Sequence, residues 1–73
     1  MKHTTVQALQ TRRLIADIRR VVDILSVDIA QEESATGISD PKLPEYSMVA
    51  RALTARRVNL ECTLAELERR LAS

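Results

Sequence analysis

The segment ESATGISDPKLP, residues 33–44, holds the only glycine of the chain, Gly37, and both of its prolines, Pro41 and Pro44. Glycine can adopt the left-handed conformation that ends a helix, and Asp40 before Pro41 can cap a short turn. A proline inside a helix costs about 3 kcal/mol, so one continuous helix through this segment is disfavoured. We therefore predict that the chain turns back on itself near Pro41 and that Pro44 opens a second helix.

Apolar residues flank this break in a heptad pattern, abcdefg, in which positions a and d face the partner helix. Residues 4–33 contain no glycine or proline, and their apolar residues recur at steps of three and four, which is typical of an amphipathic helix. The a and d positions are Ile15, Ile18, Val22, Leu25 and Ile29 in the first segment, and Tyr46, Ala50, Leu53, Arg57, Leu60, Leu64, Leu67 and Leu71 in the second. We predict a single all-α domain over residues 1–73, an antiparallel two-helix coiled-coil hairpin. Its helices span about 4–33 and 45–71, and its loop spans about 34–44.

The two segments fit an antiparallel register. When the chain turns at residue 41, seam residues face each other in pairs whose numbers add up to 82, such as Ile15 with Leu67. Charged residues at the flanking e and g positions then meet with opposite sign, which specifies direction and register more than it stabilises the fold. The expected ion pairs are Arg12 with Glu68, Arg19 with Glu61, and Asp28 with Arg56.

One seam position carries a charge. Arg57 falls at an a position opposite Leu25, and Asp28 is the nearest acidic residue in this register. One interpretation is that Arg57 lays its aliphatic stem across the layer, reaches Asp28 or solvent, and fixes the register as a buried polar residue can. The alternative is a binding residue in a groove, for an acidic ligand or a partner helix.

The helices carry more apolar residues than one seam can cover. Soluble monomers seldom expose a large apolar patch, so we expect a second copy of the chain to cover them and to form a homodimeric four-helix bundle by twofold symmetry. The expected oligomer interface comprises Leu14, Val21, Ile24, Val27, Val49 and Val58. An unknown protein partner is also expected, and the surface expected for it comprises Ile38, Leu43, Tyr46 and Met48.

The composition argues against several classes of protein. Eleven Lys and Arg against ten Asp and Glu leave a net charge of +1, so the chain as a whole does not attract nucleic acid or acidic lipid. The single cysteine, Cys62, excludes an internal disulfide and fits a reducing compartment, so we expect a cytoplasmic protein. The most apolar stretch, residues 21–30, is interrupted by Asp23, Ser26 and Asp28 and is shorter than the roughly 20 residues of a membrane helix.

Residues for catalysis or metal binding are sparse. A nucleophile needs a base within hydrogen-bond reach, and the only histidine, His3, is far in sequence from Cys62. These two residues are too few to suggest a metal site by spacing, and one glycine cannot make a glycine-rich phosphate loop. We expect no enzyme activity, no cofactor and no metal.

Outward-facing arginines support a competing interpretation. Arginines at solvated positions can contact nucleic-acid phosphates and release counterions. Acidic residues such as Asp17 and Asp23 lie among them and reduce the local positive field, and no helix-turn-helix or zinc pattern is visible. The possible phosphate contacts are Arg13, Arg20, Arg51 and Arg69.

A helical hairpin, Asp40-Pro41 in the loop and Ser47 near the start of the second helix follow one another along the chain. In this layout the chain resembles the small sporulation-type phosphatases that dock on response regulators. The serine-centred motif of that family continues to a Leu-Asp pair, which residues 47–51, SMVAR, do not reproduce, so no residue role is carried over. From the residues themselves we expect a small non-catalytic protein–protein interaction module, a regulatory or adaptor subunit. The alternative is a nucleic-acid-associated protein.

Overall fold

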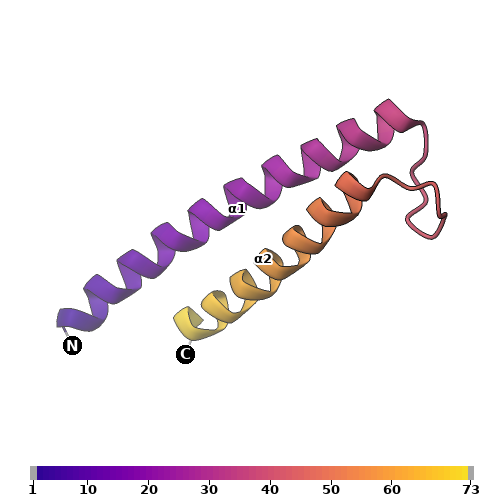
Figure 1. The fold of residues 1–73 in the computed structure, drawn as a ribbon. Coiled ribbons are helices and arrows are strands. Elements are labelled where there is room, and N and C mark those ends of the chain that lie inside the picture. Colours follow the sequence, from indigo (N-terminus) through magenta and orange to yellow (C-terminus); the bar gives the residue numbers. More distant parts are fainter. Residues whose placement is uncertain (1, 73) are drawn as a thin grey trace.

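The computed structural model describes residues 2–72, with side chains from residue 6 onward. It contains two helices, α1 (Lys2–Thr36) and α2 (Met48–Ala72), joined by an irregular loop (Figure 1). The helices pack side by side in opposite directions and form a rod with extents of 53 × 17 × 13 Å. The predicted all-α helical hairpin is confirmed.

The seam between the helices is made by the residues that the heptad pattern selects. Every predicted a and d side chain is buried or half-buried, whereas most positions between them are exposed. Ala50 is the most deeply covered, at 0% exposure, with its small side chain at an a position of the seam. The buried hydrophobic side chains are Ile15, Leu25, Ile29, Tyr46 and Ala50.

α1 ends at Thr36, three residues beyond its predicted end, because Gly37 is the first residue that cannot continue the helix. Gly37 has a φ of 73°, and its N–H donates to the carbonyl oxygen of Glu33 at 2.9 Å. This is the left-handed cap expected of a glycine. A Cβ at Gly37 would have no neighbour within 4 Å, so the backbone conformation, and not the available space, demands glycine here.

Two consecutive turns form the second half of the loop. The Leu43 N–H donates to the carbonyl oxygen of Asp40 at 3.1 Å, and the Tyr46 N–H donates to the carbonyl oxygen of Leu43 at 3.1 Å. Pro41 and Pro44 each occupy the second position of a turn, which their fixed φ suits. The prediction that Pro44 opens the second helix is therefore wrong.

α2 instead begins at Met48, after Ser47, which caps it. The Ser47 Oγ accepts a hydrogen bond from the Ala50 N–H at 3.1 Å, and the Ser47 carbonyl oxygen accepts one from the Arg51 N–H at 3.0 Å. Serine is among the preferred N-cap residues because its side chain satisfies a backbone N–H that the helix itself cannot. The predicted start at residue 45 is thus three residues early.

α1 is longer than α2, with 35 residues against 25. Leu71 and Ala72, at the end of α2, line a groove together with Ile15 and Ala16 of α1. The first turns of α1 therefore extend past the end of α2 (Figure 1). We call this segment, residues 2–11, the overhang.

Candidate interaction surface

Where the loop meets the helices, two hydrogen bonds tie α1 to the start of α2. The Tyr46 Oη donates to Glu33 Oε2 at 2.7 Å, and the Ser47 Oγ donates to Glu32 Oε1 at 2.7 Å. The hydrogen bond to the Glu33 carboxylate, together with burial of the ring, raises the pKa of the Tyr46 phenol. Tyr46 is only 3% exposed, so its predicted place on the partner surface is wrong and it belongs to the core.

Arg51 holds the loop against this tyrosine. Its Nη1 donates to the carbonyl oxygen of Pro41 at 3.0 Å, and its Nη2 donates to that of Leu43 at 3.3 Å. The guanidinium carbon lies 5.3 Å from the centroid of the Tyr46 ring, a cation–π distance. The charge of Arg51 is therefore engaged within the chain, whereas the competing interpretation gave Arg51 as a possible phosphate contact.

Further along the seam, Arg19 forms an ion pair with Glu68. The predicted partner of Arg19 was Glu61, one heptad nearer the loop, so that pairing is wrong. Glu61 and Glu68 occupy the same heptad position, e, seven residues apart. Because the side chains of Arg19 and Glu68 are long, they can reach each other along the seam. The predicted pair of Arg12 with Glu68 is wrong as well, and neither Arg12 nor Glu61 has an ion-pair partner among the side chains of residues 6–72.

Arg57 reaches Ser26, and its predicted contact with Asp28 is not made. Its Nη1 donates to the Ser26 Oγ at 3.1 Å, while its Nε is buried and has no acceptor among the described residues. The side chain is half-buried, as expected of an arginine whose stem crosses the seam. A buried N–H without an acceptor costs stability, which offsets part of what the hydrogen bond to Ser26 contributes.

These contacts lie along one edge of the seam, which we call the polar edge. Each contact includes an e-position residue, and in antiparallel helices the e positions of both partners share one edge. The four contacts that define the polar edge are Arg19–Glu68, Arg57–Ser26, Tyr46–Glu33 and Ser47–Glu32.

The g positions line the opposite edge, which we call the apolar edge. Leu14 and Val21 of α1 and Val49 of α2 lie there with their side chains exposed. Asp28 and Arg56, the third predicted ion pair, also lie there, and neither has a polar partner among the side chains of residues 6–72. One edge of the seam is thus closed by polar contacts and the other is not.

The six residues predicted for the oligomer interface are all exposed in the single chain, from 36% for Val21 to 56% for Val49. Of the residues predicted for a protein partner, Met48 is 85% exposed and Leu43 is also exposed, while Ile38 is half-buried. Sequence reasoning missed two further exposed apolar residues, Val6 and Leu9 on the overhang. Aligning the ends of the two predicted helices would have indicated them, because α2 has no residues left to face them.

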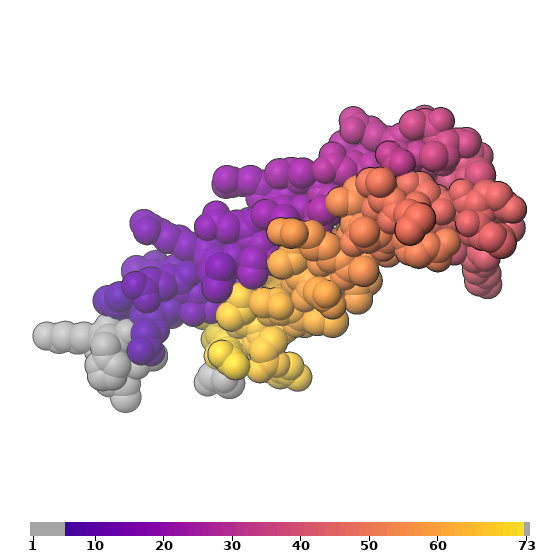
Figure 2. All heavy atoms as spheres, viewed as in Figure 1, coloured from indigo at the N-terminus to yellow at the C-terminus, as the bar shows by residue number. Residues whose placement is uncertain are grey.

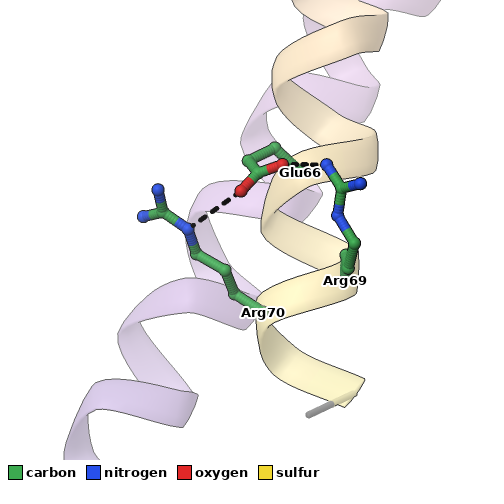
Figure 3. A network of polar contacts seen from close by, with 3 residues as sticks. All are labelled: Glu66, Arg69 and Arg70. Carbon is green, nitrogen blue, oxygen red and sulfur yellow. Dashed lines mark hydrogen bonds and ion pairs between the residues drawn. The ribbon is translucent and has the colours of Figure 1, made fainter.

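Glu66, Arg69 and Arg70 form a small ionic cluster near the end of α2 (Figure 3). Arg69 pairs with Glu66, and the Arg70 Nε lies 3.3 Å from Glu66 Oε1. The hydrogen bond and the positive charge of Arg69 lower the pKa of Glu66. Arg69 is therefore paired, whereas Arg13 and Arg20 are exposed and have no polar partner among the described residues.

Metal-binding groups do not come together in the part of the chain that the structure describes. No three His, Cys, Asp or Glu residues there are placed to hold a metal ion. Cys62 is a free, exposed thiol, and the side chain of His3 lies outside the described residues. Neither α1 nor α2 has the length and apolar character needed to cross a membrane within residues 2–72.

Comparison with known proteins identifies no relative. No family model matches the chain, and no curated protein and no solved structure matches it either. The function is therefore inferred from the side chains of this chain and from their surroundings.

Proposed function

We propose that the chain is a small, non-catalytic interaction module that pairs with a second copy to form a four-helix bundle and acts as a regulatory or adaptor subunit. The observation that carries this proposal is the row of exposed apolar side chains on a hairpin whose own core is small. Five hydrophobic side chains are buried among the described residues, while ten large ones are exposed. A core of this size supplies at most about 3–5 kcal/mol without a partner.

The surface area of the hairpin supports a second copy. A compact monomer of 8.2 kDa exposes about 4,500 Å². The hairpin exposes 5698 Å², which is about 1,200 Å² more than that expectation. A stable protein interface buries about 800 Å² on each partner, so one dimer contact accounts for most of the excess.

A further protein partner would dock at the loop end. Met48 and Leu43 are exposed there, and methionine adapts its shape to different partner surfaces. The free, exposed thiol of Cys62 suits a reducing compartment such as the cytoplasm.

The mass of the assembly in solution tests the homodimer. Sedimentation at micromolar concentration should give the mass of two chains. Ile24→Asp places a charge among the exposed apolar residues of α1 and should shift the mass to one chain, while the helical circular dichroism is retained. Ala65→Asp makes the same change at an exposed position of α2 without a large apolar neighbour, and should leave the dimer intact. A one-chain mass for the unmodified protein would refute the proposal.

Nucleic-acid binding is the competing function, and a salt titration separates the two. Two of its four arginines, Arg51 and Arg69, have partners within the chain, which leaves Arg13 and Arg20. We expect no binding to duplex or single-stranded nucleic acid at about 50 mM salt, where phosphate contacts are strong. Binding that weakens steeply as salt rises would favour the competing function.

A further inference from the structure

The uncovered apolar side chains lie mostly on α1. Of the ten exposed large hydrophobic residues, six are on α1, and none lies in residues 59–72 of α2. The six are Val6, Leu9, Leu14, Val21, Ile24 and Val27. They follow α1 from the overhang into residues 21–36, which we call the loop half of α1. α1 is therefore the helix that a partner must cover.

The charges of α1 are divided between its two halves. Residues 6–20 carry four basic side chains and one acidic side chain, whereas residues 21–36 carry four acidic side chains and no basic one. This order opposes the helix dipole, which favours acidic residues near the N-terminus and basic residues near the C-terminus. This distribution of charge therefore does not stabilise an isolated α1. It fits a partner helix whose acidic side chains lie beside residues 6–20 and whose basic side chains lie beside residues 21–36.

Several of these charges are available to such a partner. In the basic half, Arg13 and Arg20 are exposed, and in the acidic half, Asp23 and Asp28 are exposed. None of the four has a polar partner among the side chains of residues 6–72. They share the outer side of α1 with the exposed apolar residues, because the inner side is occupied by the seam.

The overhang gives a third constraint. It extends past the end of α2, with Val6 and Leu9 exposed (Figure 1). At the other end of α1, Val27 is exposed on the outer side of the helix. An antiparallel arrangement of two α1 helices lays each overhang along residues 30–36 of the other chain and brings Val27 to the level of the other chain's exposed Leu14.

Building on the homodimer proposed above, we infer that the two hairpins pack antiparallel, with α1 of one chain against α1 of its partner. The twofold axis then crosses near the middle of α1, and the basic half of each α1 lies on the acidic half of the other. Arg13 lies near the level of the partner's Asp28, and Arg20 lies near the level of the partner's Asp23. A parallel dimer instead stacks basic half on basic half and leaves both overhangs at one end.

The distance between the two loops tests this orientation. A spin label is attached at Ser39→Cys in a Cys62→Ser background, because Ser39 is exposed in the loop and Cys62 is the only native thiol. Antiparallel packing places the two labels about 50 Å apart, twice the length of half of α1. Parallel packing places them within about 20 Å, since bundled helices lie 8–10 Å apart, and that result would overturn the inference. A one-chain mass with no interchain distance would instead refute the homodimer itself.

A charge exchange within α1 provides a second measurement. Arg13→Asp should weaken the dimer about tenfold at low salt, because two symmetry-related attractions become repulsions. Adding Asp28→Arg should restore the affinity, since each new aspartate then faces a new arginine. A double variant that dimerises no better than Arg13→Asp alone would contradict the antiparallel pairing of α1 with α1.

Discussion

The hairpin has a loop half, residues 21–61, and an open half, residues 6–20 and 62–72. Both halves follow the same heptad pattern, but the seam side chains are buried to different degrees. In the loop half, Leu25, Ile29, Tyr46 and Ala50 are buried. In the open half, only Ile15 is buried among the described residues, and leucines such as Leu67 are half-buried. In the space-filling view the two chain segments lie against each other over the loop end of the hairpin (Figure 2).

The difference comes from side chains outside the heptad. The loop half is covered by the hydrogen bonds of Tyr46 and Ser47 to α1 and by Arg51, which holds the loop in place. Among the described residues, the open half has one such contact, the ion pair Arg19–Glu68, and a groove of about 390 Å³ lies beside Ile15 and Leu71. The heptad pattern therefore decides which residues face each other, whereas full burial of those residues also requires the contacts made by the loop and its flanking side chains.

Core truncations should break the hairpin unequally, and this is the largest effect we expect. Leu25→Ala, at 6% exposure, should cost about 2–5 kcal/mol of unfolding free energy, through lost burial and the cavity left behind. Leu67→Ala, at a half-buried position, should cost about half as much. Urea denaturation at equal chain concentration measures both, because dimerisation makes stability concentration-dependent. Equal losses would mean that the two halves are closed alike.

Gly37→Ala should destabilise the loop half by about 1–2 kcal/mol, because a residue with a Cβ resists the left-handed conformation. Space is not the cause, since a Cβ there meets no atom within 4 Å. Gly37→Asn is the matched control and should lose less, as asparagine tolerates this conformation. Thermal unfolding of the three proteins measures the difference, and an alanine variant as stable as the parent would contradict the conformational explanation.

Tyr46 should make the stability of the loop half sensitive to high pH. Its pKa is raised above the ordinary value of 10.0, chiefly by the hydrogen bond to Glu33, so the folded state holds the phenol proton more tightly than the unfolded chain. This contribution is complete below about pH 10 and is lost as the pH rises through the raised pKa. Stability curves above pH 9 should fall more steeply for the parent than for Tyr46→Phe. Parallel curves would exclude this role of the tyrosine.

The ion pair Arg19–Glu68 of the open half should contribute the least, about 0.2–1 kcal/mol, because both side chains are largely exposed. A double-mutant cycle of Arg19→Ala and Glu68→Ala measures the coupling, and the same cycle with Glu61→Ala should give none. Coupling of Arg19 to Glu61 and not to Glu68 would mean that the ion pair predicted from the sequence is the correct one.

Periodicity was sufficient to predict which residues form the seam, because the side of a helix on which a residue lies depends on spacing alone. It was insufficient for the polar partners. Arg19 and Arg57 have side chains long enough to reach several acceptors, and the choice between them depends on how each stem lies across its neighbours. The start of α2 was also uncertain for a physical reason, since Pro44 suits the second position of a turn as well as the first turn of a helix.

The contacts that close the loop half join residues near in sequence, 13 residues apart for Tyr46 and Glu33 and 15 for Ser47 and Glu32. The ion pair Arg19–Glu68 joins residues 49 apart. Short separations lose less chain entropy on contact formation, so folding should begin at the connection and spread toward the termini. The half that is most tightly covered would also be the first to form, and the chain ends would come together last.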